Sequence, residues 1–363
     1  MPQIETPIRV YGPDSSYFTG KLEAYLRYKE IPYELHDQNP FPKLRKETGI
    51  AQVPGVELRD GRWMTDTTPI IAWLETQVDG PAVIPSDPVQ AFFSLLLEDY
   101  ADEWLWRPAM HYRWSYAQDA HFEGRKLAEE LLAPLKWPGF VKRLAVRNRQ
   151  RRLFVRGDGV TPTTRAHVEG IYLTTLEQLQ AILRDRPFLL GDIPTIADYG
   201  FFGSMFRHFG LDPTPARIMR DTASDVYEWV ARVWNARASQ AHGDLAEGIP
   251  PEWGPILDAV GSAYLPHQAA NAAAWKAGER KFDVEIEGTL YRGLWTSRYR
   301  VWCLEQLRSH FEALPEAARD EVRGTLEAHG CWEPLWRVEA PESGVDPEGR
   351  APFAPGHSMI GLP

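Results

Sequence analysis

The first part of the chain alternates between strand-like and helix-like patterns of apolar positions. Residues 8–11 form a short β-type run, and residues 31–36 alternate between apolar and polar side chains. Between these runs the apolar positions recur at helical spacing, at Phe18, Leu22, Tyr25 and Leu26. This order predicts a βαβ unit whose two strands run parallel.

The next part of the chain predicts a hairpin followed by a helix. Two short runs, residues 56–59 and 62–64, flank Asp60-Gly61, a pair that favours a tight hairpin turn. Residues 65–69 then combine N-cap side chains with a proline suited to a first helical turn. The order βαβ followed by ββα predicts the thioredoxin-like arrangement, a small sheet with helices packed on it.

The rest of the chain has mainly helical patterns. Residues 79–88 form a linker rich in Pro and Asp, and residues 89–116 predict one long helix or two. Residues 299–314 and 316–329 predict two further helices. Residues 282–287 alternate between apolar and acidic side chains, which indicates a half-buried strand or an extended segment packed on helices.

These patterns divide the chain into an α/β thioredoxin-like N-terminal domain, an all-α domain, a mainly α C-terminal extension and a tail. The expected ranges are residues 1–80, 89–240, 241–340 and 341–363. The extension carries six tryptophans, so we expect it to pack on the all-α domain, where it either helps to close or shape the electrophile site or only covers an apolar surface. The tail is rich in Pro and Gly and is expected to be extended or mobile.

Composition and charge exclude several function classes. The chain has 363 residues, of which 44% are apolar, and a net charge of −10, so general binding to nucleic acid or to an anionic membrane is not expected. It has only Cys303 and Cys331, without metal-site spacing, so any thiol chemistry needs a ligand's thiol. No apolar stretch approaches the roughly 18 residues of a membrane span, and we expect a cytoplasmic protein. A basic run, residues 142–156, is either a solvated helix end or an anion contact.

Three N-terminal segments together resemble a known family. They are residues 15–34 (SSYFTGKLEAYLRYKEIPYE), 52–61 (QVPGVELRDG) and 64–75 (MTDTTPIIAWLE). They are similar to the glutathione-binding domain of the cytosolic glutathione S-transferases, and residues 187–206 (PFLLGDIPTIADYGFFGSMF) resemble the all-α second domain of that family. The resemblance covers roughly residues 6–240 and implies glutathione as co-substrate and a two-fold homodimer.

The resemblance places a catalytic hydroxyl or thiol after the first strand. Ser16 stands just before the helix that starts near Phe18, where unpaired amides and the helix dipole favour an anion. A free thiol with a pKa of about 8.5 is only a few per cent ionised at pH 7, so a hydroxyl donor here would promote the thiolate. Ser16 is the candidate and Ser15 its rival. Alternatively, Tyr11 or Tyr17 donates, or the serines only cap the helix.

The resemblance also implies how the tripeptide is held. A cis bond between Val53 and Pro54 would let the main chain of Val53 pair with the cysteinyl unit like an added strand. Gln52 would bond the glycyl or cysteinyl end. Thr67 and its amide would take the γ-glutamyl carboxylate, and Asp66 would face the amino group. The family usually has Glu-Ser at this pair, and Asp is one methylene shorter than Glu.

Aromatic residues suggest where the electrophile binds. Trp104, His111 and Tyr112 lie in an aromatic-rich segment, and Tyr17 stands at the start of the first helix. These four residues are candidates for the pocket wall, although such a stripe also suits a core. The acidic residues Glu98, Asp99, Asp102 and Glu103, together with His111, have the composition of a metal site. An ion pair and a solvent-exposed helix face explain the acidic residues equally well, so we expect no metal.

A glutathione transferase is the leading hypothesis for the function. Its activated sulfur would attack a hydrophobic or aromatic electrophile by alkyl or aryl transfer, as in detoxification. Positions 15–17 hold no cysteine, which argues against the branches of the family that form a mixed disulfide with glutathione. A glutathione-dependent isomerase, lyase or dehalogenase is an alternative on the same site. A non-catalytic interaction module on this fold is another.

Overall fold

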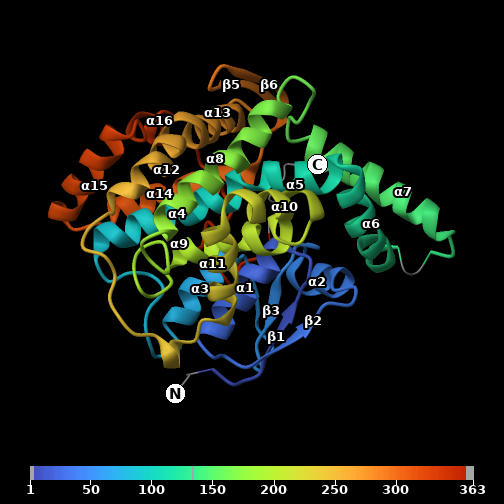
Figure 1. Cartoon of the computed structure of the whole chain (residues 1–363), viewed down its shortest axis with the longest axis horizontal. Coiled ribbons are helices and arrows are strands. Elements are labelled where there is room, and N and C mark those ends of the chain that lie inside the picture. The colour runs from blue at the N-terminus through green and yellow to red at the C-terminus, as the bar shows by residue number, and fades with distance from the viewer. Residues whose placement is uncertain (1–3, 133–134, 357–363) are drawn as a thin grey trace.

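The computed structural model describes residues 4–132 and 135–356, and Figure 1 shows a small sheet domain beside a larger body of helices. The sheet domain contains β1 (Ile8–Tyr11), α1 (Tyr17–Tyr28), β2 (Tyr33–His36), α2 (Phe41–Thr48), β3 (Gly55–Glu57), β4 (Trp63–Thr65) and α3 (Thr67–Glu75). The strand order is β2-β1-β3-β4, with β1 and β2 parallel and β3 antiparallel to both neighbours. This confirms the predicted thioredoxin-like fold.

Local sequence explains most of these elements. The Asp60-Gly61 pair makes the predicted turn, where Leu58 N donates to Arg62 O at 2.9 Å and Gly61 has a φ of 87°. The apolar pattern does not predict α2, because Leu44 is the only apolar residue that this short helix buries.

The all-α domain follows the linker. It contains α4 (Pro88–Trp104), α5 (Trp106–Ser115), α6 (Ala117–Leu131), α7 (Gly139–Gln150), α8 (Arg165–Leu183), α9 (Ile196–Ser204), α10 (Pro213–Thr222) and α11 (Ser224–Asn235), with π-helical turns η1 (Arg151–Arg156) after α7 and η2 (Met205–Phe209) after α9. Helix α9 packs against both α1 and α4. A Cβ at Gly200 would lie 2.7 Å from Glu98 Cα, so glycine permits this close approach. Among the described helices, none is long and apolar enough to cross a membrane.

The C-terminal extension is a further layer of helices. It contains α12 (Gly254–Ala259), the π-helical turn η5 (Val260–Tyr264), α13 (Leu265–Lys276), β5 (Lys281–Ile286), β6 (Thr289–Trp295), α14 (Arg298–Glu312), α15 (Glu316–Ala328) and α16 (Trp332–Trp336). The alternating run at residues 282–286 lies in β5, which pairs antiparallel with β6, and Glu287 follows in the turn between them. Helices α14 and α15 pack against α4, and Trp253 is buried with its indole N–H donating to Leu189 O at 2.9 Å. The extension therefore shares a core with the all-α domain (Figure 1).

The last described segment, residues 341–356, lies against the sheet domain. It forms no helix or strand, but its Pro352 O accepts from Thr65 N at 2.9 Å, and Gly356 N donates to Thr48 O at 3.1 Å. The sequence predicts an extended or mobile tail, and these residues are held against the sheet domain without forming a helix or strand. The reason is that β4 is an edge strand whose free amide takes a partner from the segment. The rest of the predicted tail, residues 357–363, lies outside the described residues.

Candidate active site

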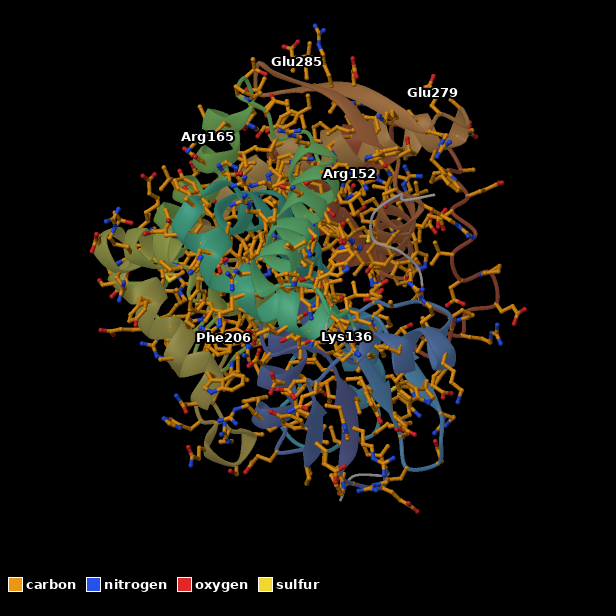
Figure 2. The ribbon with its side chains drawn as sticks, turned by 90° about the vertical axis from the view of Figure 1, so that its right-hand side faces the viewer. Lys136, Arg152, Arg165, Phe206, Glu279 and Glu285 are labelled. Atoms are coloured by element: carbon orange, nitrogen blue, oxygen red, sulfur yellow. The ribbon has the colours of Figure 1, made fainter. Side chains whose placement is uncertain are left out.

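A cleft of about 380 Å³ lies between the sheet domain and the helices α5 to α7. Figure 2 looks onto this side, with Lys136 in the loop between α6 and α7 next to the sheet domain. An ion pair between Asp14, before α1, and Lys126 on α6 joins the two sides. The lining includes Ser15, Ser16, Tyr17 and Phe18 at the start of α1, Gln52 and Val53 before β3, and Trp106, Met110, Arg113, Trp114, Glu123, Arg149, Gln150 and Phe154 on the helices.

Both candidate serines line the cleft. Ser16 is the N-cap of α1, and its Oγ accepts a hydrogen bond from Thr19 N at 3.3 Å. A capping hydroxyl accepts through a lone pair, so the Ser16 O–H proton stays free to donate to a ligand. Ser15 is buried, and its carbonyl accepts from Arg113 Nη1 at 3.1 Å. Helix capping and thiolate stabilisation are therefore compatible at Ser16.

The two tyrosine alternatives have other partners. Tyr17 Oη donates to Ala101 O, and burial raises the pKa of this phenol well above its usual value. Tyr11 Oη donates to Glu57 Oε2 at 2.8 Å and is not among the residues that line the cleft. The ring of Tyr17 thus lines the cleft, while its hydroxyl is hydrogen-bonded to a main-chain carbonyl.

The predicted peptide-binding loop borders the cleft. The Val53-Pro54 bond is cis, and Gln52 and Val53 line the cleft beside the serines. Gln52 Oε1 is buried without a partner among the described residues. Gln52 and Val53 also line a small neighbouring pocket that contains Asp66 and Thr67. The open cleft and this small pocket are therefore adjacent.

Asp66 and Thr67 lie in a closed pocket. Asp66 precedes α3 with a φ of 71° and a ψ of 119°, a strained conformation that costs about 1–3 kcal/mol and is typical of functional sites. Its Oδ2 accepts from Tyr299 Oη at 2.8 Å, and burial raises the pKa of the carboxyl to about 6. The spaces around Asp66 measure about 10 and 30 Å³, so nothing larger than a water molecule fits there.

Three residues expected in the electrophile pocket lie elsewhere, which corrects that assignment. Trp104 packs on Tyr264 with ring centroids 6.3 Å apart, His111 bonds Glu169 at 3.0 Å, and Tyr112 packs on Tyr172. Trp104 is the last residue of α4 and does not lie on α5. For His111 and Tyr112 the physical reason is helical periodicity, because the opposite face of α5 lines the cleft. That face consists of Trp106, Met110, Arg113 and Trp114. None of residues 242–340 lines the cleft, whereas Tyr299 of this range lines the two small spaces beside Asp66.

A buried polar network forms the floor of the cleft. Arg113 Nε donates to Asp212 Oδ2 at 2.8 Å, and its Nη1 lies 2.9 Å from His208 Nε2. Burial, with a further contribution from Arg113, lowers the pKa of His208 well below its usual value, so this imidazole is neutral at pH 7. The network fixes the Arg113 guanidinium, which in turn holds the Ser15 carbonyl at the start of α1.

The basic run contributes to the site in two ways. Arg149 lines the cleft as a cation, which matches the anion-contact alternative. Arg151 instead donates to Trp114 O at 2.6 Å and to Ser115 O at 3.4 Å, so it satisfies carbonyls at the end of α5. The sequence offered no signal that separates these two arginines.

Several polar atoms around the cleft lack a partner within the described residues. All are buried, and they are Gln52 Oε1, Trp106 Nε1, Trp114 Nε1, Glu123 Oε2 and Gln150 Oε1. An unpaired buried polar group costs about 1–3 kcal/mol, and native proteins rarely leave several such groups together. A ligand or ordered water in the cleft would complete these atoms.

The acidic residues of α4 form ion pairs. Lys21 contacts Glu98 and, at 2.5 Å, Asp102, while Arg300 Nε bonds Glu103 at 3.2 Å. In the ranges that the structure describes, no group of three His, Cys, Asp or Glu side chains is arranged to hold a metal.

Comparisons with known proteins agree with this architecture. Residues 10–82 match the family model of the glutathione S-transferase N-terminal domain, and residues 164–236 match that of the C-terminal domain. No curated protein matches the chain. These matches identify, in chain order, a glutathione S-transferase N-terminal domain and a glutathione S-transferase C-terminal domain within the chain.

Several solved structures match part of this chain at low sequence identity. The β-etherase LigF from Sphingobium sp. strain SYK-6 is 16% identical over 63% of this chain and 95% of its own, with a TM-score of 0.45. A glutathione S-transferase from Rhodospirillum rubrum F11 is 19% identical over 69% and 92%, with a TM-score of 0.42. One from Methylobacterium radiotolerans, in complex with glutathione sulfonate, is 18% identical over 66% and 99%, with a TM-score of 0.39.

Proposed function

We propose that this protein is a glutathione transferase that activates the glutathione thiol at the start of α1 and transfers it to an aromatic electrophile. One observation carries the proposal. A single cleft contains the Ser16 hydroxyl, the first turn of α1, the Gln52-Val53 main chain and a group of buried polar atoms without partners.

Ser16 is the proposed thiolate stabiliser. Its O–H proton donates to the sulfur while its lone pair keeps the bond from Thr19 N. The positive end of the α1 dipole favours the same negative charge. The thiol proton leaves to water, the sulfur forms a bond to the electrophilic carbon, and the leaving group departs with the bonding electrons. Ser16 itself remains unmodified.

The tripeptide is proposed to lie along the junction of the two domains. The main chain of Val53 pairs with the cysteinyl unit, and the unpartnered Oε1 of Gln52 accepts a hydrogen bond from the tripeptide there. Arg45 also lines the cleft, and its cation suits the glycyl carboxylate. Asp66 and Thr67 are proposed to hold the γ-glutamyl group.

The electrophile is proposed to lie among the aromatic rings of the cleft. Trp106 stacks near Phe18 with centroids 6.2 Å apart, and Phe154 meets the same indole edge-on at 5.9 Å. Flat apolar walls of this kind favour a planar ring. The Trp106 N–H and the Arg149 cation are available for oxygen atoms on that ring.

Matched serine variants test the proposal. Glutathione should bind with micromolar to millimolar affinity in calorimetry. Ser16→Ala should lower kcat with an aromatic electrophile by about 100-fold, the equivalent of a two-unit pKa shift, and change the Kd for glutathione by less than about threefold. Ser15→Ala is the matched control, because it removes the neighbouring hydroxyl and leaves Ser16 in place.

The outcomes separate the alternatives. Wild-type activity in both variants would remove either serine from the mechanism, and a folded protein that binds no glutathione would favour a non-catalytic module. Conversion without loss of a leaving group would favour an isomerase. We also propose a cytoplasmic two-fold homodimer, which light scattering at the mass of one chain would contradict.

A further inference from the structure

Tyr299, on the extension, occupies the space next to Asp66. Its ring is 9% exposed, and its hydroxyl donates to Asp66 Oδ2 at 2.8 Å. Tyr299 lines both of the small spaces that surround Asp66. An amino group that approached this carboxylate from the cleft would therefore compete with the Tyr299 hydroxyl for the same oxygen.

The C-terminal segment covers Tyr299 from outside. It starts from α14, where Arg298 Nε donates to Ser343 O at 2.6 Å and Glu305 Oε1 accepts from Ser343 N at 2.7 Å. It ends on the sheet domain, where Pro352 and Gly356 bond the main chain. Within it, Phe353 packs on Trp73 with ring centroids 5.2 Å apart. The segment spans the pocket as a strap fixed at both ends.

A second cavity on the other side of Tyr299 gives its ring a place to move. This cavity measures about 340 Å³ and is lined by α3, α4, α14 and the C-terminal segment. Tyr299 lines it together with Trp302 and Cys303. The Tyr299 side chain thus lines both the small spaces at Asp66 and this larger cavity, and a change of its rotamer would move the ring from the first toward the second.

We propose that Tyr299 is a gate and specificity residue of the γ-glutamyl subsite: it occupies the place of the ligand's amino group on Asp66 and must turn aside before glutathione binds fully. The inference rests on the proposed function. With the gate closed, the cleft accepts the cysteinylglycine part of the tripeptide, which needs no contact with Asp66. The γ-glutamyl group therefore adds little affinity in the wild-type protein.

Paired thiols and matched tyrosine variants test the gate. Calorimetry on the full chain compares reduced glutathione with cysteinylglycine, and wild type should bind the two within about threefold. Tyr299→Ala should bind glutathione about tenfold more tightly, because the bound state no longer has to displace the ring, and cysteinylglycine within about twofold of wild type. Tyr227→Ala, at an exposed position of α11, is the control.

Two further measurements keep the test decisive. Tyr299→Phe loses the hydrogen bond to Asp66 but keeps the ring, so its affinity for glutathione should rise only two- to threefold. This variant replaces Tyr299→Ala in the test if the alanine variant does not fold. Hydrogen exchange at the Thr65 and Gly356 amides should accelerate when wild type binds glutathione but not cysteinylglycine, because the strap loosens as Tyr299 turns.

Each outcome has a distinct meaning. An unchanged ratio of the two affinities in both Tyr299 variants would overturn the gate while leaving thiol binding intact. A wild-type protein that already prefers glutathione tenfold would also overturn it. If no variant binds either thiol, the proposed function fails, and the gate fails with it.

Discussion

The open cleft and the closed pocket at Asp66 lie side by side but satisfy their polar groups in opposite ways. Around the cleft, buried side-chain atoms such as Trp106 Nε1 and Gln150 Oε1 have no partner in the described chain. In the closed pocket, the Asp66 carboxylate is bonded by a residue 233 positions away in sequence. The chain itself therefore supplies a partner for Asp66, whereas the unpartnered atoms around the cleft are available to a ligand or to water.

The closed region has a buried charged support, as the cleft has in its Arg113–Asp212 pair. Lys21 is buried at the α1–α4 contact, where it pairs with Glu98 and Asp102 and donates to Thr68 Oγ1 at 3.3 Å. Ser16 stands one turn earlier on the same helix and faces the cleft. Helix α1 therefore links a buried ionic cluster to residues that line the cleft.

The largest expected effect comes from breaking the closed region. Lys21→Met leaves two buried carboxylates without their cation and should lower the free energy of unfolding by about 3–5 kcal/mol. Urea denaturation measures this loss. Lys46→Met, at an exposed site on α2, should change stability by less than about 0.5 kcal/mol. A stable Lys21→Met protein would show that the region does not depend on charge pairing.

The pH dependence of stability sharpens the comparison. Burial raises the pKa of Asp99 to about 8, and the groups that face it are Tyr264, Cys303, Glu98 and Glu103. An acid with a raised pKa binds its proton more tightly in the folded state, so stability falls as the pH rises from about 4 to about 8. The contribution of Asp99 is about 1 kcal/mol for each pH unit.

Asp99→Asn isolates that contribution. Urea denaturation at several pH values should show similar stability for the variant and wild type near pH 4, and a growing advantage for the variant up to pH 8. Equal slopes for the two proteins would contradict the raised pKa of Asp99.

The smallest effect compares one polar group from each region. Tyr299→Phe removes a made hydrogen bond and should cost about 1–2 kcal/mol of stability in the free protein. Gln150→Met removes an oxygen that has no partner and should change stability by less than about 0.5 kcal/mol or raise it slightly. Thermal unfolding of both variants is the measurement. Equal losses of stability in the two variants would show that the Gln150 amide already makes a stabilising hydrogen bond in the protein without ligand.

Sequence patterns predict the fold better than the site. Strand alternation, helical spacing and the Asp60-Gly61 turn are local signals, and the sheet domain and the main helices follow from them. The start of α1 is also a local signal, which is why Ser15 and Ser16 could be placed at a helix N-terminus from the sequence. The structure places both serines on the cleft.

The helical wall and the closed pocket could not be predicted in this way. The aromatic density of residues 104–114 does not say which helix face meets the ligand, and the choice of His111 and Tyr112 took the wrong face. The pairing of Asp66 with Tyr299 depends on how the extension folds back over the sheet domain. A contact between residues so far apart in the sequence produces no periodic pattern or characteristic spacing from which it could be predicted.

The covered edge of β4 has a consequence for shortened forms of this chain. Residues 351–356 bond the Thr65 amide and the Thr48 carbonyl. A chain cut after Arg350 would therefore expose the edge of β4 and the apolar surface of Trp73 on which Phe353 packs. Bare edges recruit strands from other molecules. A protease that trimmed this end would therefore produce chains that associate with one another, and aggregation would mark the loss of the segment before any change in catalysis was measured.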